Sequence, residues 1–180
     1  MKNNLFKLLT EFGPLAIFAL YYYKNKDVME AITPFLVATI LSLIIVKLSK
    51  KKIAVIPLVG SILIIIFYSL SLIFSNPVFI FIRPTILNIS LALALILNKK
   101  YSKKLLLKSI IGHSIKMKNK GWNILTQRWI KLLFILALLN EFIWRTQNTE
   151  VWVNYKLWGI LLITLVFSFF QINLIKKNKI

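Results

Sequence analysis

The sequence predicts an all-α, polytopic membrane helix bundle, and its composition and patterning are the reasons. Of the 180 residues, 58% are hydrophobic and only 16% are charged, a balance typical of a membrane protein. The apolar residues gather in runs close to the roughly 20 residues that a helix needs to cross about 30 Å of hydrocarbon. We therefore expect a single transmembrane domain over residues 1–180, with five to six transmembrane helices and one basic interfacial helix.

The first apolar run, residues 5–23, decides between five and six crossings. Lys7 and Glu11 lie in its first turns, and Gly13 and Pro14 interrupt its centre. Because proline removes a backbone donor and kinks a helix, this run either spans the membrane or starts at its interface. No small-residue cleavage pattern follows it, so a cleaved signal peptide is not expected. Five further spans are expected, at residues 29–46, 53–74, 78–97, 128–145 and 157–175.

The segment 98–123 is too polar to cross the membrane. On a helical projection, one arc holds the apolar residues Leu106, Leu107, Ile110, Ile111 and Met117. This pattern predicts a basic amphipathic helix in the cytoplasmic headgroup layer, and the alternative is a solvated basic loop. Eight lysines of the segment are expected to contact the headgroups of anionic lipids: Lys99, Lys100, Lys103, Lys104, Lys108, Lys116, Lys118 and Lys120.

The distribution of positive charge predicts the topology. The formal net charge is +19, from 24 Lys and Arg against 5 Asp and Glu. Most of the positive residues lie in the loop 47–52, in the segment 98–123 and at the C-terminus, so these parts are expected in the cytoplasm. Because the charges sit in short loops between apolar runs, they favour membrane lipids over nucleic acid as partners.

Polar residues inside the fifth span are the strongest site candidates, since ionisable groups at membrane depth are costly. Asn140, Glu141 and Arg145 are expected to form an inward-facing polar cluster, in which Glu141 and Arg145 pair across one helical turn. A second polar site is expected at Glu11 and Asn88. A proton or substrate relay between Glu11 and Glu141 is the functional alternative to a structural pair.

The tryptophans predict anchoring at the membrane interface, and the sequence contains no motif that indicates catalysis. Four tryptophans are expected as interfacial anchors: Trp129, Trp144, Trp152 and Trp158. The chain has no cysteine and a single histidine, His113. It also contains no phosphate-binding loop, GxSxG or HExxH motif. We therefore expect no enzyme activity and no catalytic, cofactor-binding or metal site.

Five segments together carry a family resemblance: EFGPLAIF from residue 11, RPT from residue 83, GWNILTQRW from residue 121, LNEFIWRTQ from residue 139 and WVNYKLWG from residue 152. They resemble the intracellular septation protein A family, also called YciB, whose members are small bacterial inner-membrane proteins. The resemblance implies a multi-pass inner-membrane protein with a role in cell envelope biogenesis and integrity, membrane homeostasis and septation. It also implies links to membrane proteins of cell division and elongation, and no enzymatic activity.

Two classes of function remain at this level. The first is a non-enzymatic membrane scaffold that supports the envelope and septation through helix contacts and lipid binding. The alternative is a small transporter or lipid-handling protein that uses Glu11, Glu141 and the proline-broken helices. No inverted repeat is evident between the first three and the last three spans, which favours the scaffold.

Overall fold

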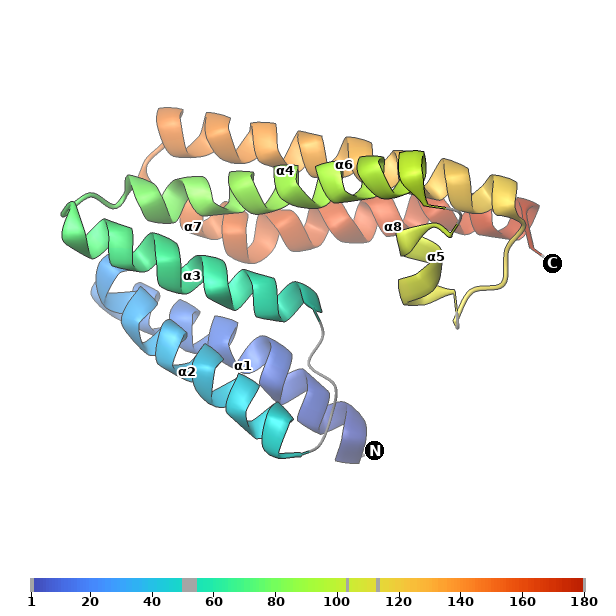
Figure 1. Ribbon diagram of the computed structural model, residues 1–180. Coiled ribbons are helices and arrows are strands. Elements are labelled where there is room, and N and C mark those ends of the chain that lie inside the picture. The colour runs from blue at the N-terminus through green and yellow to red at the C-terminus, as the bar shows by residue number, and fades with distance from the viewer. Residues whose placement is uncertain (1, 50–54, 103, 113, 180) are drawn as a thin grey trace. The chain divides into compact units, whose positions relative to one another are not determined.

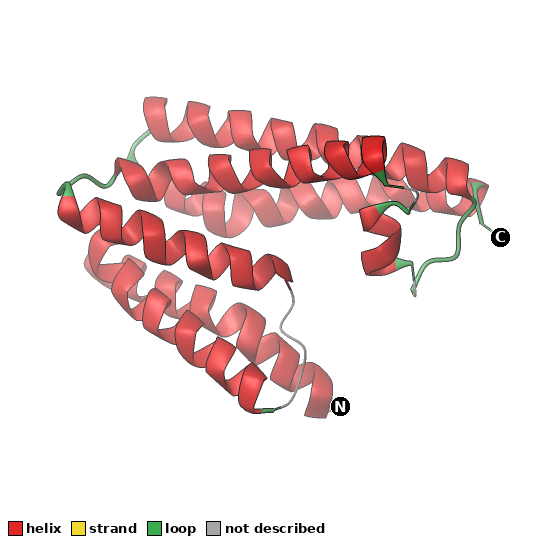
Figure 2. Ribbon diagram, viewed as in Figure 1, coloured by secondary structure: helices red, strands yellow, loops and turns green. Residues whose placement is uncertain are grey.

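The computed structural model describes residues 2–49, 55–102, 104–112 and 114–179, and these residues are largely helical (Figure 1). The side chains of residues 2–9, 11, 55–59 and 72 lie outside this description. No strand occurs in the described ranges (Figure 2), apart from one isolated bridge between two residues. The all-α membrane helix bundle predicted from the sequence is confirmed.

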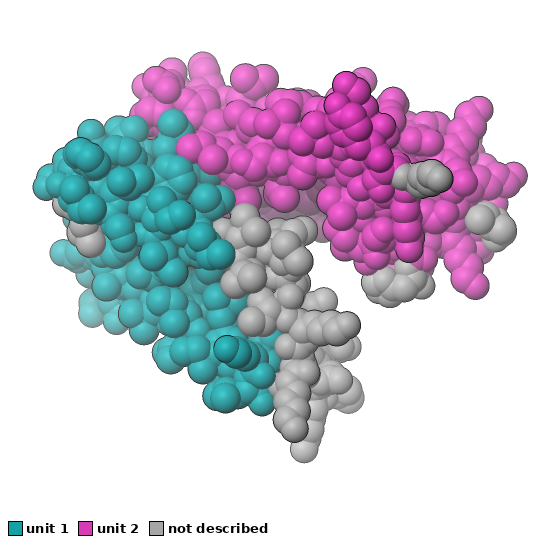
Figure 3. Space-filling view, viewed as in Figure 1, with its two compact units in different colours: residues 1–83 teal, residues 84–180 magenta. Residues whose placement is uncertain are grey.

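The chain divides into two compact units, Met1–Arg83 and Pro84–Ile180 (Figure 3). The division falls within the fourth helix, immediately before Pro84. Each unit has its own packing and is described by itself.

The first unit contains α1 (Lys2–Asn25), α2 (Val28–Leu48) and α3 (Val55–Ile73). A tight turn joins α1 to α2, and the Asp27 carboxylate caps α2 by accepting the backbone N–H of Met29 at 2.6 Å. The two helices pack through aromatic rings, with the Phe18 and Phe35 centroids 5.8 Å apart. A hydrogen bond between the hydroxyls of Thr33 and Tyr68 joins α2 to α3.

The second unit contains most of α4 (Val78–Tyr101), then α5 (Leu106–Ile111), α6 (Asn119–Thr146), α7 (Thr149–Asn154), a π-helical turn (Tyr155–Gly159) and α8 (Ile160–Lys177). Ala92 and Leu95 of α4 pack against Leu133 of α6 in a small apolar core. The Trp129 ring of α6 meets the Phe167 ring of α8 edge-on, with centroids 5.0 Å apart. The longest described helix, α6, therefore contacts both α4 and α8.

Four helical segments among the described residues are long and apolar enough to cross a membrane: Val28–Leu48, Val78–Tyr101, Asn119–Thr146 and Thr149–Lys177. A shorter apolar helical stretch covers Gly60–Ser71. These segments fit a polytopic protein. The number of crossings, and whether α1 is one of them, stays a prediction.

The basic segment between α4 and α6 differs from the helix expected there. Only Leu106–Ile111 is helical, and Met117, expected on the same helical face, lies beyond the helix with 1% of its surface exposed. The backbone N–H of Leu106 donates to the Asn98 side chain at 2.6 Å, which satisfies one of the free donors at the start of α5. At the other end, a Cβ on Gly112 would lie 2.2 Å from the Lys108 carbonyl oxygen, so only glycine fits the close approach that ends α5.

Candidate functional site

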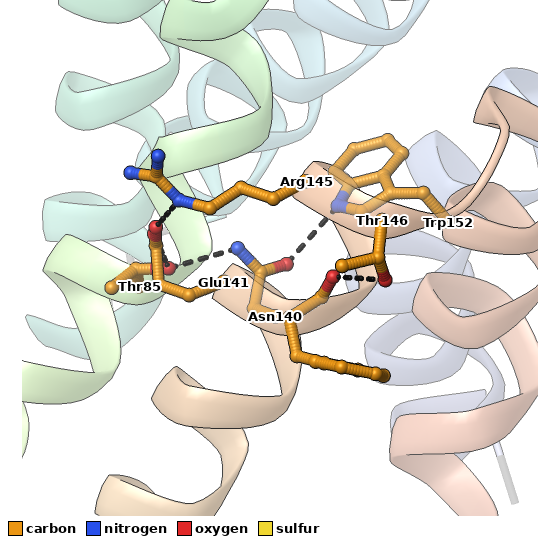
Figure 4. Close-up of polar contacts among 7 residues, drawn as sticks. Thr85, Asn140, Glu141, Arg145, Thr146 and Trp152 are labelled. Carbon is orange, nitrogen blue, oxygen red and sulfur yellow. Dashed lines mark hydrogen bonds and ion pairs between the residues drawn. The ribbon is translucent and has the colours of Figure 1, made fainter.

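The site is built at the C-terminal end of α6, where three polar residues predicted from the sequence lie within two turns. Asn140, Glu141 and Arg145 belong to α6, while α4 contributes Thr85 and α7 contributes Trp152 (Figure 4). We call these five residues the polar clamp. Because Gln147 and Asn148 alone separate α6 from α7, Trp152 folds back beside Asn140.

Hydrogen bonds connect the polar clamp without interruption (Figure 4). The Trp152 indole N–H donates to Asn140 Oδ1 at 3.1 Å, and Asn140 Nδ2 donates to Thr85 Oγ1 at 2.9 Å. The Thr85 hydroxyl donates to Glu141 Oε1 at 2.7 Å. Glu141 Oε2 accepts from Arg145 Nε at 2.8 Å, the ion pair expected from their i, i+4 spacing.

The hydrogen bonds of the polar clamp form a chain that ends on Glu141, which accepts from Thr85 and from Arg145. Trp152 and Arg145 have no proton-accepting group, so the direction of their hydrogen bonds is fixed. The Asn140 side chain accepts from Trp152 through its oxygen and donates to Thr85 through its nitrogen. The Thr85 hydroxyl accepts from Asn140 and donates to Glu141. The chain of hydrogen bonds therefore fits an ionised Glu141 that acts only as an acceptor.

Burial differs along the polar clamp. Asn140 is 1% exposed, Trp152 3% and Thr85 7%, whereas the Glu141 and Arg145 side chains are 24% and 59% exposed. Leaving a buried donor or acceptor without a partner costs about 1–3 kcal/mol, while an exposed ion pair is worth about 0–1 kcal/mol. The buried amide end therefore dominates the stability of the polar clamp. The Arg145 guanidinium also lies over the Trp144 ring, 4.4 Å from its centroid.

A second contact joins α6 to the π-helical turn, one helical turn before Asn140 on α6. The Tyr155 hydroxyl donates to the Leu136 carbonyl oxygen at 3.3 Å. Tyr155 begins the π-helical turn, and such a turn shifts the register of the residues that follow it. Within this turn a Cβ on Gly159 would lie 2.8 Å from the Tyr155 ring, so the glycine leaves room for the ring.

The polar clamp is an arrangement for holding helices. Both Glu141 oxygens are occupied, and no group of three or more metal-ligating residues occurs among the described residues. Sequence reasoning identified Asn140, Glu141 and Arg145 but missed Thr85 and Tyr155. Thr85 lies in the RPT segment, which carries part of the family resemblance. Nothing in the local sequence indicates that it lies beside residues 55 and 56 positions away.

Other predicted site residues are less connected. The side chains of Glu11 and His113 lie outside the described part of the chain. Asn88 is half-buried on α4, one turn after Thr85. Since Glu11 and Asn88 also belong to different units, a site formed by these two residues stays a prediction.

The tryptophans expected as interfacial anchors have different surroundings. Trp158 is 58% exposed, and Trp129 and Trp144 are half-buried. Trp152 differs from the expectation, because its ring is buried inside the protein, where Asn140 accepts its N–H.

The lysines expected to contact lipid headgroups remain accessible in the main. Lys99 and Lys108 are half-buried, and Lys108 Nζ donates to Asn119 Oδ1 at 2.9 Å. Lys103 lies outside the described residues. The other five are exposed: Lys100, Lys104, Lys116, Lys118 and Lys120.

The helices and the polar clamp define a multi-pass, all-α membrane protein in which a cluster of polar groups joins helices. The family model described as intracellular septation protein A matches residues 6–180. This chain belongs to the intracellular septation protein A family, and it is a multi-pass protein of the inner membrane.

Relatives support the same assignment over nearly the whole chain. The chain is 33% identical to the inner membrane-spanning protein YciB of Brucella melitensis biotype 1, over 98% of this chain and 94% of the relative. It is 32% identical to the protein of the same name from Brucella suis biovar 1, with the same coverage. The Brucella anthropi protein is 33% identical over 98% of this chain and 86% of its own length. No solved structure matches the chain.

Proposed function

We propose that this protein is a non-enzymatic membrane scaffold that supports envelope biogenesis and integrity, membrane homeostasis and septation. Its partners in this proposal are membrane proteins of cell division and elongation and the anionic lipids of the membrane. The observation that carries the proposal is the polar clamp, in which the costly intramembrane polar groups bind one another.

The state of Glu141 favours the scaffold over a transporter. A coupling carboxylate has to change its proton or its ligand during each transport cycle. In this protein Thr85 and Arg145 donate to the two Glu141 oxygens at 2.7 and 2.8 Å. Releasing either donor would break the contact of α6 with α4 or the ion pair at the end of α6. We therefore assign Glu141 a structural role.

The outer surface of the second unit supplies a place for partner helices and lipid. The side of α8 directed away from the core carries large exposed apolar residues: Leu161, Leu162, Leu165, Val166, Phe169 and Phe170. In a membrane protein such a side contacts lipid tails or another transmembrane helix. The polar clamp holds α6 to α7, and the π-helical turn continues α7 into α8. The polar clamp therefore helps to fix the position of the exposed apolar side of α8.

The test is Glu141→Gln in a strain depleted of the native protein, with the amount of membrane-inserted variant measured. A glutamine side chain keeps the shape and one acceptor oxygen, so a scaffold should retain most of its function. A transporter that uses the Glu141 charge should lose it. Glu150→Gln is the matched control, because Glu150 is an exposed acid in the first turn of α7 and lies outside the polar clamp.

A defect for Glu141→Gln at normal membrane levels, with Glu150→Gln active, would overturn the structural role. Cysteine-directed crosslinking from the exposed side of α8 would then identify the partners, since the natural chain has no cysteine to interfere. Capture of division or elongation proteins supports the scaffold. Crosslinks to lipid alone would contradict the protein partners.

A further inference from the structure

Residues 176–179, the C-terminal tail, contact the basic segment between α4 and α6, the linker, just before α6 begins. Met117 and Lys179 form an antiparallel bridge, and the Lys118 N–H donates to the Asn178 carbonyl oxygen at 2.9 Å. Figure 1 shows the yellow linker and the red C-terminus at the same end of this unit. The linker and the tail therefore lie on the same side of the membrane.

A small apolar core lies beneath this connection. Met117, Trp122, Leu125 and Leu174 are each at most 8% exposed and contact one another. Half-buried residues of the linker pack against them: Leu105, Leu107, Ile111 and Ile115. The linker is thus folded onto α6 and α8, which distinguishes it from a solvated loop.

Gly121 permits the close approach of the tail. A Cβ at this position would lie 2.7 Å from the Asn178 Cβ and 2.8 Å from the Met117 Cγ, distances that side chains do not tolerate without movement. Any larger residue at position 121 would push the tail or Met117 away. The glycine of the GWNILTQRW segment therefore has a packing role here.

The lysines above this core have no acidic residue nearby in the sequence. No Asp or Glu occurs between Glu30 and Glu141, nor after Glu150. The tail adds three exposed lysines, Lys176, Lys177 and Lys179, to the exposed lysines of the linker. The first turn of α6 also contains no acid, so its free N–H groups add to the positive potential.

We propose that the linker and the C-terminal tail form one preorganised basic surface that binds the headgroups of anionic phospholipid. We call the surface formed by residues 98–102, 104–112, 114–120 and 176–179 the basic surface. The proposal rests on the lipid binding included in the proposed function and adds the tail as part of the site. Phospholipid is the favoured partner because the surface begins at the ends of α4, α6 and α8, where headgroups lie. Lysines are hydrated point charges that suit many headgroups at once.

The charge arm of the test uses the full chain in detergent, titrated with phosphatidylglycerol or phosphatidylcholine and followed by native mass spectrometry. Each lysine near an anionic surface is worth about fivefold in affinity. Replacing Lys176, Lys177 and Lys179 by Gln should weaken phosphatidylglycerol binding at least about tenfold, as should the same change at Lys100, Lys116 and Lys118. Phosphatidylcholine binding should not change. The matched control is Gln at Lys24, Lys26 and Lys47 of the first unit.

The geometry arm keeps every lysine. Gly121→Val should displace the tail and lower phosphatidylglycerol affinity several-fold, whereas Gly13→Val should not, because a Cβ at Gly13 meets nothing within 4 Å. Circular dichroism checks that both variants remain helical. If Gly121→Val does not fold, Met117→Cys with Lys179→Cys replaces it. These two positions form a non-hydrogen-bonded pair, whose Cα atoms are typically about 4.5 Å apart. The crosslinked form should bind at least as tightly as the reduced form.

Each outcome decides a different claim. If the linker variant loses affinity and the tail variant behaves like the control, the tail is not part of the site and this inference fails. If neither variant loses affinity, the lipid binding of the proposed function fails as well. A tail variant that loses affinity for a labelled DNA oligonucleotide, but not for phosphatidylglycerol, would overturn the choice of lipid.

Discussion

The two ends of α6 use polar residues in opposite ways. At its C-terminal end, the polar clamp surrounds Glu141 with donors, and its three least exposed members are buried. At its N-terminal end, an apolar core around Trp122 holds the basic linker while most of the described lysines there stay exposed. One end therefore uses polar groups to hold helices, and the other leaves charge available for a ligand. Charged residues can therefore hold helices together or stay available to a ligand, depending on whether other residues of the chain already bind them.

The largest expected difference between the two ends of α6 is the side of the membrane on which each lies. Reporters fused after Lys179 and within residues 99–120 should both report the cytoplasm, because the bridge between Met117 and Lys179 joins these segments. A reporter near Thr149 should give the opposite signal, since α6 is long and apolar enough to cross the membrane between the two ends. Opposite signals from Lys179 and the linker would contradict the bridge. A reporter at the N-terminus separately decides between five and six crossings.

Asn140→Ala should give the largest loss of stability in the polar clamp. It removes the acceptor of the buried Trp152 N–H and the donor to Thr85, each at a cost of about 1–3 kcal/mol. Thermal unfolding in detergent is the measurement. Asn123→Ala is the matched control, because Asn123 is exposed on the same helix. Equal melting temperatures for the two variants would mean that the buried Asn140 amide does not stabilise the polar clamp.

Gly159→Ala tests the packing of the Tyr155 ring, whose hydroxyl donates to the Leu136 carbonyl oxygen. The added Cβ would lie 2.8 Å from the Tyr155 ring, and such overpacking typically costs about 1–3 kcal/mol. Alanine has the higher helix propensity, so a gain in stability would mean that the ring moves without cost. Gly13→Ala serves as the control, since it introduces the same methyl group where nothing lies within 4 Å.

Arg145→Leu should have the smallest effect, about 1 kcal/mol, because the Arg145 side chain is 59% exposed. The variant keeps the bond from Thr85 to Glu141, which limits the loss. Replacing Glu141 by Leu as well also removes the acceptor of Thr85, so the double variant should lose further stability, but less than the two single losses added together because the ion pair is lost only once. A double variant that is less stable than the sum of the two single changes would contradict the pairing.

Local patterns allowed the sequence to predict the helices and the i, i+4 pair, while contacts between distant residues escaped it. The spacing of Glu141 and Arg145 is enough to predict their pairing, because one helical turn brings them together. Thr85 and Trp152 join the polar clamp only through helix packing. The bridge from Met117 to Lys179 crosses 62 residues, and no periodicity indicates it. For the same reason the linker was predicted as a longer helix than the structure contains.

The bond between Thr85 and Glu141 tests the structural role of the polar clamp most directly, because it joins α4 to α6. The measurement is a double-mutant cycle of Thr85→Val and Glu141→Leu on the free energy of unfolding in detergent, since leucine leaves no acceptor for the Thr85 hydroxyl. A charged hydrogen bond between these two residues predicts a coupling energy of about 1–3 kcal/mol. A coupling energy near zero would mean that Glu141 does not hold α4 to α6 and would contradict the account.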